Sequence, residues 1–272
     1  MKKRCTIKLI IIYIKKAYEM NINYLNINQY LEHDQVRSLR DIHAKRALRT
    51  HTKFLFENIA FRLSKLLLEA KRKLGEVLSA FEILDSHAMD VVLNNLGVRN
   101  PLPPALHSFY VLIETTGSDE SYDREKLETF LFRSMENGLI SDGTIAQDIN
   151  QASSFWRIRE GVPEALMKSG AVYKYDLSIH VEKMYDLVEE MRTRLGHPAN
   201  VVGYGHLGDG NLDLNITSPQ YDDAILAQIE PFVYEWTSKH RGSISAEHGV
   251  ALMKVNKIYY SKFPEVVSTS CW

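Results

Sequence analysis

Hydrophobic and polar residues follow regular patterns from about Leu67 onward. Two short runs rich in apolar and aromatic residues, Ser79–Leu84 and Phe109–Glu114, have the length of β-strands. Met89–Leu96 lies between them and is predicted to be a helix, and the breaker-rich segment Arg99–Pro104 follows it. The regular part of the chain is therefore expected to begin as strand, helix, strand.

A longer helix is predicted over Ser118–Glu136. Ser118 or Asp119 can cap its N-terminus, acidic residues crowd its first turn, and Gly138 comes just after its end. Apolar residues recur at helical spacing along it and would form the face that packs on the core: Leu127, Phe130, Leu131 and Met135.

The second half of the chain again alternates predicted strands with predicted helices. Val172–Ile179 is a predicted strand, and Val201–Ile216 is predicted to form two strands joined by a tight turn. Another amphipathic helix is predicted over Tyr221–His240, with a kink or interruption at Pro231 because proline cannot donate the helical hydrogen bond. A further helix that stops at Gly196 is predicted from apolar residues at helical spacing: Val181, Met184, Val188, Met191 and Leu195.

Short strands that alternate with helices able to cover a sheet face predict an α+β fold, with a mostly antiparallel sheet covered by helices. No repeat at a solenoid period is visible. With 272 residues and 45% hydrophobic content, the chain can bury a sizeable core. We assign this domain to residues 67–264.

Charge divides the chain into two parts. Residues 1–66 carry 14 Lys and Arg against 5 Asp and Glu, a net of +9, whereas residues 67–272 carry 19 against 29, a net of −10. The step predicts a poorly defined basic N-terminal segment over residues 1–66, either helical or disordered. Such a segment can bind nucleic acid or an anionic membrane or act in targeting, but a solvated arm is the favoured interpretation, and we expect no nucleic-acid partner.

The extreme N-terminus shows no clear targeting signal. Met1–Lys16 places basic residues around the apolar run Ile7–Ile14, but it lacks the cleavage site of a secretory signal and the amphipathic, Arg- and Ser-rich pattern of a transit peptide. No apolar run approaches the roughly 20 residues of a membrane span. Cys5 and Cys271 form no disulfide framework and suit no metal site.

The segment Gly203–Asn215 carries the first candidate site. Gly208–Gly210 favours a tight turn that can bring His206 back beside the strand that follows. The turn lacks the Lys-Ser/Thr of a P-loop and the order GxGxxG, so a phosphate loop is excluded. Because side chains alternate along a strand, three polar residues share one face while the leucines between them point into the core. They are Asn211, Asp213 and Asn215.

The segment Gly242–Gly249 carries the second candidate site, since adjacent Glu247 and His248 bring a carboxylate and an imidazole to one pocket. One nitrogen and two oxygen donors, from His206, Asp213 and Glu247, make a plausible three-ligand set for zinc with an open fourth position. His248 then remains for proton transfer. Spacing alone, however, favours ordinary surface histidines over metal ligands.

A third stretch supplies cations that could hold carboxylates. Trp156–Glu160 precedes a predicted short helix, and Tyr173–Asp176 lies on the next strand. Arg159 could bind a carboxylate through its two-pronged guanidinium and Lys174 as a point charge. Spacing alone favours exposed cations with no ligand.

Several long segments of this sequence occur together in one known family. They are AFEILD, IETTGSDE, DREKLE, AQDINQASSFWRIREG, AVYKYDLS, GYGHLGDGNLDLN, EPFVYEWTSKHRGSISAEHGV and YYSK, and they extend from about Leu67 to about Glu265. Through these segments the chain resembles the D-2-hydroxyglutarate dehydrogenases, most of all those of plants. That family is similar to vanillyl-alcohol oxidase and D-lactate dehydrogenase. Its N-terminal domain binds FAD, and its C-terminal region supplies the substrate site, a cap and a zinc site.

The resemblance implies FAD-dependent oxidation of D-2-hydroxyglutarate to 2-oxoglutarate, with a 2-hydroxy acid as the small-molecule substrate. Position by position, it implies that His206 and Glu247 bind zinc, that Arg159 and Lys174 hold the diacid, and that Asn215 contacts the substrate. It implies that His248 also contacts the substrate and takes the proton of the 2-hydroxyl while hydride leaves C2 for the flavin. The family is mitochondrial and passes electrons to an electron-transfer flavoprotein.

Departures from the family pattern modify these expectations. Asp213 stands where the family has a histidine ligand, so we expect it to bind zinc but to weaken the metal as a Lewis acid. Pro163 stands where the family usually has threonine, which removes a hydroxyl. Residues 265–272 look like an unrelated tail in place of the family's C-terminal stretch. Residues 1–66 contain no Gly-rich pyrophosphate loop, so the part that binds FAD is expected to be missing and the chain to be inactive alone.

Two other functions stay open. The chain could be a non-catalytic fragment that binds a metal or a dicarboxylate or docks on a complete homologue, or it could belong to another 2-hydroxy-acid dehydrogenase such as D-lactate dehydrogenase. Flavin absorbance at about 450 nm would favour a complete flavoenzyme over the first of these. The sequence makes no prediction of the oligomeric state.

Overall fold

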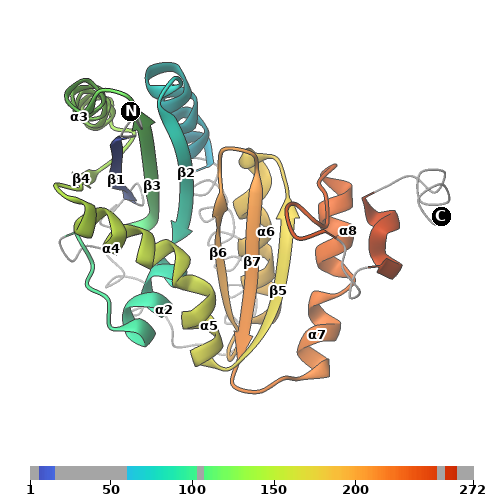
Figure 1. The fold of residues 1–272 in the computed structure, drawn as a ribbon. Coiled ribbons are helices and arrows are strands. Elements are labelled where there is room, and N and C mark those ends of the chain that lie inside the picture. The colour runs from blue at the N-terminus through green and yellow to red at the C-terminus, as the bar shows by residue number, and fades with distance from the viewer. Residues whose placement is uncertain (1–5, 16–59, 103–106, 250–254, 262–272) are drawn as a thin grey trace, which may run out of the picture.

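The computed structural model describes residues 6–15, 60–102, 107–249 and 255–261. Seven strands form one sheet in the order β4-β1-β3-β2-β6-β7-β5, and every pairing in it is antiparallel. Figure 1 shows helices in front of this sheet and behind it, so the predicted α+β fold is confirmed. The strands are β1 (Thr6–Lys15), β2 (Leu78–Asp85), β3 (His107–Gly117), β4 (Asp142–Ile145), β5 (Ala171–Ser178), β6 (Asn200–His206) and β7 (Asn211–Ser218).

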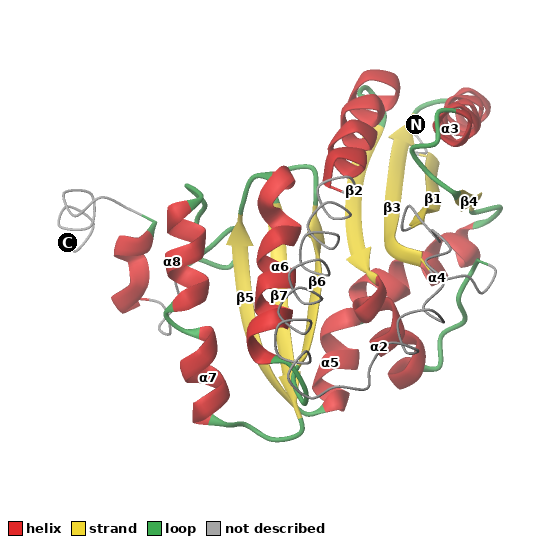
Figure 2. Cartoon of the chain, turned by 180° about the vertical axis from the view of Figure 1, so that it is seen from behind, coloured by secondary structure: helices red, strands yellow, loops and turns green. Residues whose placement is uncertain are grey.

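Different helices cover the two faces of the sheet. Helices α2, α4 and α5 lie on the side that faces the reader in Figure 1, which we call the α4 face, and α6 lies on the opposite side, the α6 face, seen in Figure 2. The helices are residues 60–74, α2 (Ser86–Leu96), α3 (Glu120–Glu136), α4 (Ile149–Glu160), α5 (Val162–Ser169), α6 (Val181–Leu195), α7 (Asp223–Ile229) and α8 (Phe232–Lys239), with a 3-10 helix at Val255–Tyr260.

Each face of the sheet has its own hydrophobic core. The larger core joins the helix at residues 60–74 and helices α3, α6, α7 and α8 to the leucines and isoleucines of the α6 face. The smaller core joins α2, α4 and α5 to a shorter apolar part of the α4 face, which includes Leu84 and Tyr204. Burial of apolar surface on both faces stabilises the sheet and leaves the remaining part of the α4 face for polar residues.

The predicted helix ends follow from local chemistry. The carboxylate of Asp119 accepts a hydrogen bond from the N–H of Tyr122 and caps α3, and Gly138 takes the left-handed conformation (φ 65°) just beyond the helix. Leu127 and Phe130 are buried as predicted, but Met135 is 41% exposed, so its assignment to the core was wrong. The core ends one turn before the helix does.

The other predicted helices of the second half also form. Met184, Val188 and Met191 of α6 are buried, and the helix ends at Gly196. The predicted helix over Tyr221–His240 is interrupted into α7 and α8, and Pro231 stands at the N-terminal cap of α8. The interruption predicted at the proline is therefore confirmed.

The N-terminal part differs from what we expected of residues 1–66. Thr6–Lys15 is a strand that pairs with β3 along its length and with β4 on its other side. Its run of β-branched residues favours a strand, whereas we had weighed it only as a targeting signal. The boundary expected between residues 66 and 67 falls inside the helix at residues 60–74, where Leu66 is fully buried in the larger core.

Trp156–Glu160 precedes the short helix α5, as predicted, and it forms the last turns of helix α4. Cys5, Cys271 and the expected tail over residues 265–272 lie outside the described residues. In the described parts of the chain, no helix is both long enough and apolar enough to cross a membrane.

Candidate functional site

Strand register assembles a row of polar side chains on the α4 face. Strand β7 lies between β6 and β5, so Asp213 stands opposite Tyr204 on one side and Asp176 on the other. Two residues further along β7, Asn215 stands opposite Lys174 of β5. Residues at this spacing share one face of a strand, so all five side chains leave the sheet on the same side.

The alternation predicted for β7 is confirmed. Leu212 and Leu214 are 1% and 0% exposed and belong to the larger core on the α6 face. Asn211 and Asn215 are buried as well, but on the α4 face, where apolar packing is replaced by hydrogen bonds. The turn before the strand contains Gly210 at φ 80°, a conformation that favours glycine.

Strand β2 adds a buried carboxylate beside His206. Glu82 lies opposite His206 in the β2–β6 pairing and is only 2% exposed. Its Oε1 lies 2.6 Å from Nδ1 of His206, and because a carboxylate has no hydrogen to give, the ring nitrogen donates. This bond is the main reason why the pKa of His206 is raised. The other ring nitrogen, Nε2, lies 3.3 Å from Oε1 of Glu247.

Arg159 reaches the same place from the last turn of α4 and is 8% exposed. Its Nε donates to Oε2 of Glu82 at 2.9 Å, and its Nη2 lies 3.8 Å from Oδ2 of Asp213. The guanidinium carbon stands 4.9 Å from the centre of the Tyr204 ring, a cation–π distance. The site therefore contains a cation held in a defined orientation.

Asp213 titrates near neutrality in this setting. Burial raises its pKa from 3.8 to about 6, and the positive charge of Arg159 offsets only part of the effect. A carboxyl group that exchanges its proton in this range is typical of functional sites.

A second buried carboxylate holds the segment that carries Glu247 and His248. Oδ2 of Asp176 accepts hydrogen bonds from the backbone N–H groups of Ala246, Glu247 and His248 at 3.2, 3.0 and 2.9 Å. Its Oδ1 accepts from Nδ2 of Asn211 at 2.7 Å. Burial alone would raise the pKa of Asp176, but these hydrogen bonds outweigh it and the pKa is lowered.

The predicted residues around the metal and the base lie together on this face. His206 and Glu247 are in contact, and Asp213 lies on the same face beside Arg159. His248 lies in the segment next to this cluster, where its backbone N–H donates to Asp176, and its side chain is exposed.

The structure also places the predicted residues that remain. Lys174 is exposed on β5, opposite Asn215, whose side-chain amide donates to the hydroxyl of Tyr204 at 3.2 Å. Pro163 lies in the first turn of α5, a position that tolerates proline because no helical hydrogen bond is lost there. No hydroxyl is present at that position.

The donor atoms fit a metal only in part. Among the described residues, no three side chains of His, Cys, Asp or Glu stand together as a ready-made metal site. The separation of 3.3 Å between Nε2 of His206 and Oε1 of Glu247 nevertheless matches two ligands of one tetrahedral zinc, which stand about 3.4 Å apart when each is about 2.1 Å from the metal. Asp213 would have to turn from Arg159 to become the third donor.

Sequence reasoning missed three members of the site, Glu82, Asp176 and Tyr204. Glu82 and Tyr204 lie in runs that look like core strands, and Asp176 lies in a segment noted only for its lysine. One signal was present: a carboxylate inside an apolar strand is costly to bury without a partner.

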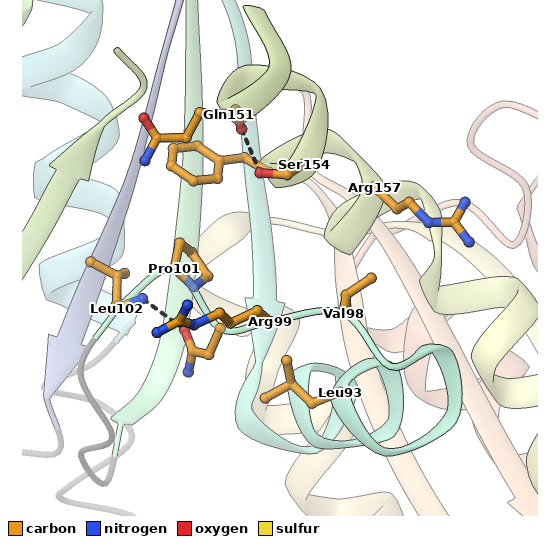
Figure 3. A pocket seen from close by; sticks show the side chains of 10 residues that line it. Leu93, Val98, Arg99, Pro101, Leu102, Gln151, Ser154 and Arg157 are labelled. Carbon is orange, nitrogen blue, oxygen red and sulfur yellow. Dashed lines mark hydrogen bonds between the residues drawn. The ribbon is translucent and has the colours of Figure 1, made fainter. Parts of the chain in front are cut away.

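A cavity lies elsewhere on the α4 face of the described structure. Its volume is about 820 Å³, and Leu93, Val98, Leu102 and Phe155 line it together with Arg99 and Gln151. Figure 3 shows the lining side chains of α2, of the segment that follows it and of α4 around this cavity. None of the predicted site residues lines this cavity.

Comparisons with known proteins identify the family of this chain. Residues 54–270 match the family of FAD-linked oxidases, C-terminal domain. The chain is 63% identical over 232 residues to a mitochondrial D-2-hydroxyglutarate dehydrogenase of Arabidopsis thaliana, a match covering 82% of this chain and 41% of the relative. It is 54% identical over 196 residues to the protein of that name in Danio rerio, covering 72% and 36% of the two chains.

The chain thus spans about two fifths of the length of the curated relatives it matches. Among solved structures, a 4-ethylphenol oxidase from Gulosibacter chungangensis in complex with isoeugenol superimposes with a TM-score of 0.51 at 9% identity. That likeness covers 97% of this chain and 50% of the other and concerns the fold alone.

Proposed function

This chain belongs to the FAD-linked oxidase family through its C-terminal domain, and we propose that it forms the substrate side of a D-2-hydroxyglutarate dehydrogenase. The proposed reaction is the FAD-dependent oxidation of D-2-hydroxyglutarate to 2-oxoglutarate. The names of the relatives support this choice of substrate.

One observation carries the proposal. The guanidinium of Arg159 lies over the ring of Tyr204, whose hydroxyl accepts from Asn215, and it shares the carboxylate of Glu82 with His206, which contacts Glu247. A fixed cation next to neutral hydrogen-bonding groups suits a carboxylate, and a histidine–carboxylate pair suits a hydroxyl that must lose its proton. A 2-hydroxy acid carries both groups on adjacent atoms.

The proposal gives Arg159, Lys174 and Asn215 the task of binding the substrate. Arg159 can bind one carboxylate with its Nη atoms because Nε is already bonded to Glu82. Lys174 is exposed and can reach a second carboxylate as a point charge. Asn215 can bond the substrate through the carbonyl oxygen of its side chain, since its amide nitrogen bonds Tyr204. Two cations on one face favour a diacid over a monoacid.

Zinc is the second part of the proposal, with His206, Asp213 and Glu247 as its ligands. The bond from Nδ1 of His206 to Glu82 leaves Nε2 available, and the distance to Glu247 suits tetrahedral coordination. Bound zinc would supply Lewis acidity at the 2-hydroxyl, and bound FAD would supply the hydride acceptor. Asp213 in the ligand set adds negative charge and makes the metal a weaker Lewis acid than a histidine would.

His248 is the proposed base for the proton of the 2-hydroxyl, and it also contacts the substrate. Its backbone N–H is bonded to Asp176, so the residue is anchored while its exposed imidazole can turn toward the substrate. An imidazole titrates near neutrality and can both accept and release this proton.

FAD contacts are not assigned to the described residues. The Gly208–Gly210 turn leads into strand β7 and not into a helix, so it lacks the helix N-terminus that favours a pyrophosphate. For the enzyme as a whole we further propose a mitochondrial location and electron transfer from FAD to an electron-transfer flavoprotein. The location is supported by the names of the relatives, which are mitochondrial.

Calorimetric titration of the 272-residue chain tests the proposal. We expect D-2-hydroxyglutarate to bind at least tenfold more tightly than D-lactate, which lacks the second carboxylate, since one good ionic contact contributes roughly 1.5–3 kcal/mol. It should also bind more tightly than its L-enantiomer, whose 2-hydroxyl has the opposite configuration. Arg159→Lys keeps the charge but removes the two-pronged geometry and should weaken binding. Arg157→Lys, on an exposed side chain of the same helix, is the matched control. Equal binding of D-lactate would favour another 2-hydroxy-acid dehydrogenase, and no binding of any of the three would contradict the proposal.

A further inference from the structure

Glu82 uses both of its carboxylate oxygens inside the site. Oε2 accepts from Nε of Arg159 at 2.9 Å, and Oε1 accepts from Nδ1 of His206 at 2.6 Å. The side chain is buried, so its two oxygens are shielded from water. One buried carboxylate therefore joins a residue of helix α4 to a residue at the end of strand β6.

The first consequence concerns the ring of His206. With the hydrogen on Nδ1 committed to Glu82, the neutral ring presents a bare Nε2 toward Glu247. A carboxylate behind a histidine ring fixes both its tautomer and its orientation. Without Glu82, the ring could carry its hydrogen on either nitrogen.

The second consequence concerns Arg159. The bond through Nε fixes one edge of the guanidinium, and the Tyr204 ring lies 4.9 Å from its centre. The Nη atoms stay directed into the site, where Nη2 lies 3.8 Å from Asp213. Because the fork is rigid, a carboxylate that binds its outer edge meets donors already in place.

We propose that Glu82 is a positioning residue that sets the tautomer of His206 and the direction of Arg159 together, although it touches neither the substrate nor a metal. The inference rests on the proposed function for what His206 and Arg159 then bind. It makes the two halves of the site dependent on each other, since a change at Glu82 releases the proton-transfer side and the carboxylate-binding side at once.

Glu114 provides a matched control because it is a second carboxylate of the same sheet that also contacts α4. Its Oε1 accepts from the indole N–H of Trp156 at 3.1 Å, and its Oε2 accepts from the hydroxyl of Ser79 at 3.0 Å. It has no bond to His206 or Arg159 among those described. Glu114→Gln therefore disturbs the attachment of α4 without changing the site directly.

The test compares Glu82→Gln with Glu114→Gln in the 272-residue chain. Nitrogen-15 NMR of the histidine rings at alkaline pH, where they are neutral, reports which nitrogen of His206 carries hydrogen, and His206→Asn identifies the signal. We expect hydrogen on Nδ1 in the unmodified chain and in Glu114→Gln. In Glu82→Gln, we expect a mixture of the two tautomers. Affinity for D-2-hydroxyglutarate should fall about 10- to 100-fold in Glu82→Gln and should change little in Glu114→Gln.

Two results would overturn the proposal. One is a His206 ring without hydrogen on Nδ1 in the unmodified chain. This result does not depend on the folding of any variant. The other is a His206 signal in Glu82→Gln that matches that of Glu114→Gln. If the unmodified chain does not bind D-2-hydroxyglutarate, the proposed function fails, and the tautomer of His206 alone decides the role of Glu82.

Discussion

The two faces of strand β7 carry side chains of different kinds. On the α6 face, Leu212 and Leu214 are buried among apolar side chains and contribute to folding. On the α4 face, Asn215 is buried and Asp213 is partly buried, but they lie beside other polar and charged groups. Burial on the α6 face therefore stabilises the fold, whereas burial on the α4 face encloses the charged groups of the proposed site and costs stability at Asp213.

Leu214→Ala tests the apolar face and should have the largest effect. The side chain is 0% exposed, so its truncation leaves a cavity and should lower the free energy of unfolding by about 2–5 kcal/mol. Urea denaturation measures the change, and Ile149→Ala, at a residue that is 65% exposed, is the control with an expected change within about 0.5 kcal/mol. A loss at Leu214 as small as that at Ile149 would mean that this face is not a packed core.

Asp213→Asn should change the free energy of unfolding in the opposite direction. The pKa of Asp213 is raised from 3.8 to about 6, so the folded state favours the protonated group. Its contribution to stability is fully present below pH 3.8 and is lost as the pH rises through about 6. At neutral pH and without metal, removal of the charge should therefore raise the free energy of unfolding, by about 3 kcal/mol at most. Equal stability of the two proteins at pH 7 would show that the buried charge has no cost.

Asp176→Asn should affect the attachment of the segment that carries Glu247 and His248. The variant loses charge-assisted hydrogen bonds to three backbone N–H groups, and we expect a loss of about 2 kcal/mol in unfolding free energy. Because the pKa of Asp176 is lowered, its contribution is present at neutral pH and is lost as the pH falls through the folded pKa. Faster hydrogen exchange at residues 246–248 is the direct measurement, and unchanged exchange there would rule out the anchoring role.

Tyr204→Phe should have the smallest effect. It removes the hydroxyl that accepts from the amide of Asn215 at 3.2 Å but keeps the ring beside Arg159. One such hydrogen bond contributes about 1 kcal/mol. Binding of D-2-hydroxyglutarate should weaken by a similar free energy because Asn215 becomes free to turn. A loss as large as that in Arg159→Lys would mean that the hydroxyl itself contacts the substrate.

The sequence predicted what depends on spacing along one segment. The alternation in Asn211–Asn215 predicted the two faces of β7, and Asp119 and Gly138 predicted the ends of α3. Alternation does not say which strands become neighbours, however. The pairing of β2 with β6 brings together Glu82 and His206, and no local pattern encodes a contact between residues 124 positions apart.

The same reason explains the missed parts of the fold. Strand β1 pairs with β3 about a hundred residues later in the chain, and Ile10 lies opposite Ile113. Because its partner is so distant, the basic and apolar pattern of Thr6–Lys15 did not by itself indicate a strand of this sheet. Strand β4 is only four residues long and contains Gly143, which makes it too short for a periodic signal. Asp176 was missed because its partners are the backbone N–H groups of a distant segment.

A crystal structure of the chain with D-2-hydroxyglutarate tests the central claim most directly, namely that the polar part of the α4 face is the substrate site. We predict one carboxylate on the Nη atoms of Arg159, the second near Lys174, and the 2-hydroxyl between His206 and His248. A diacid found instead in the cavity lined by Leu93, Phe155 and Arg157, with the polar strands unchanged, would contradict the account.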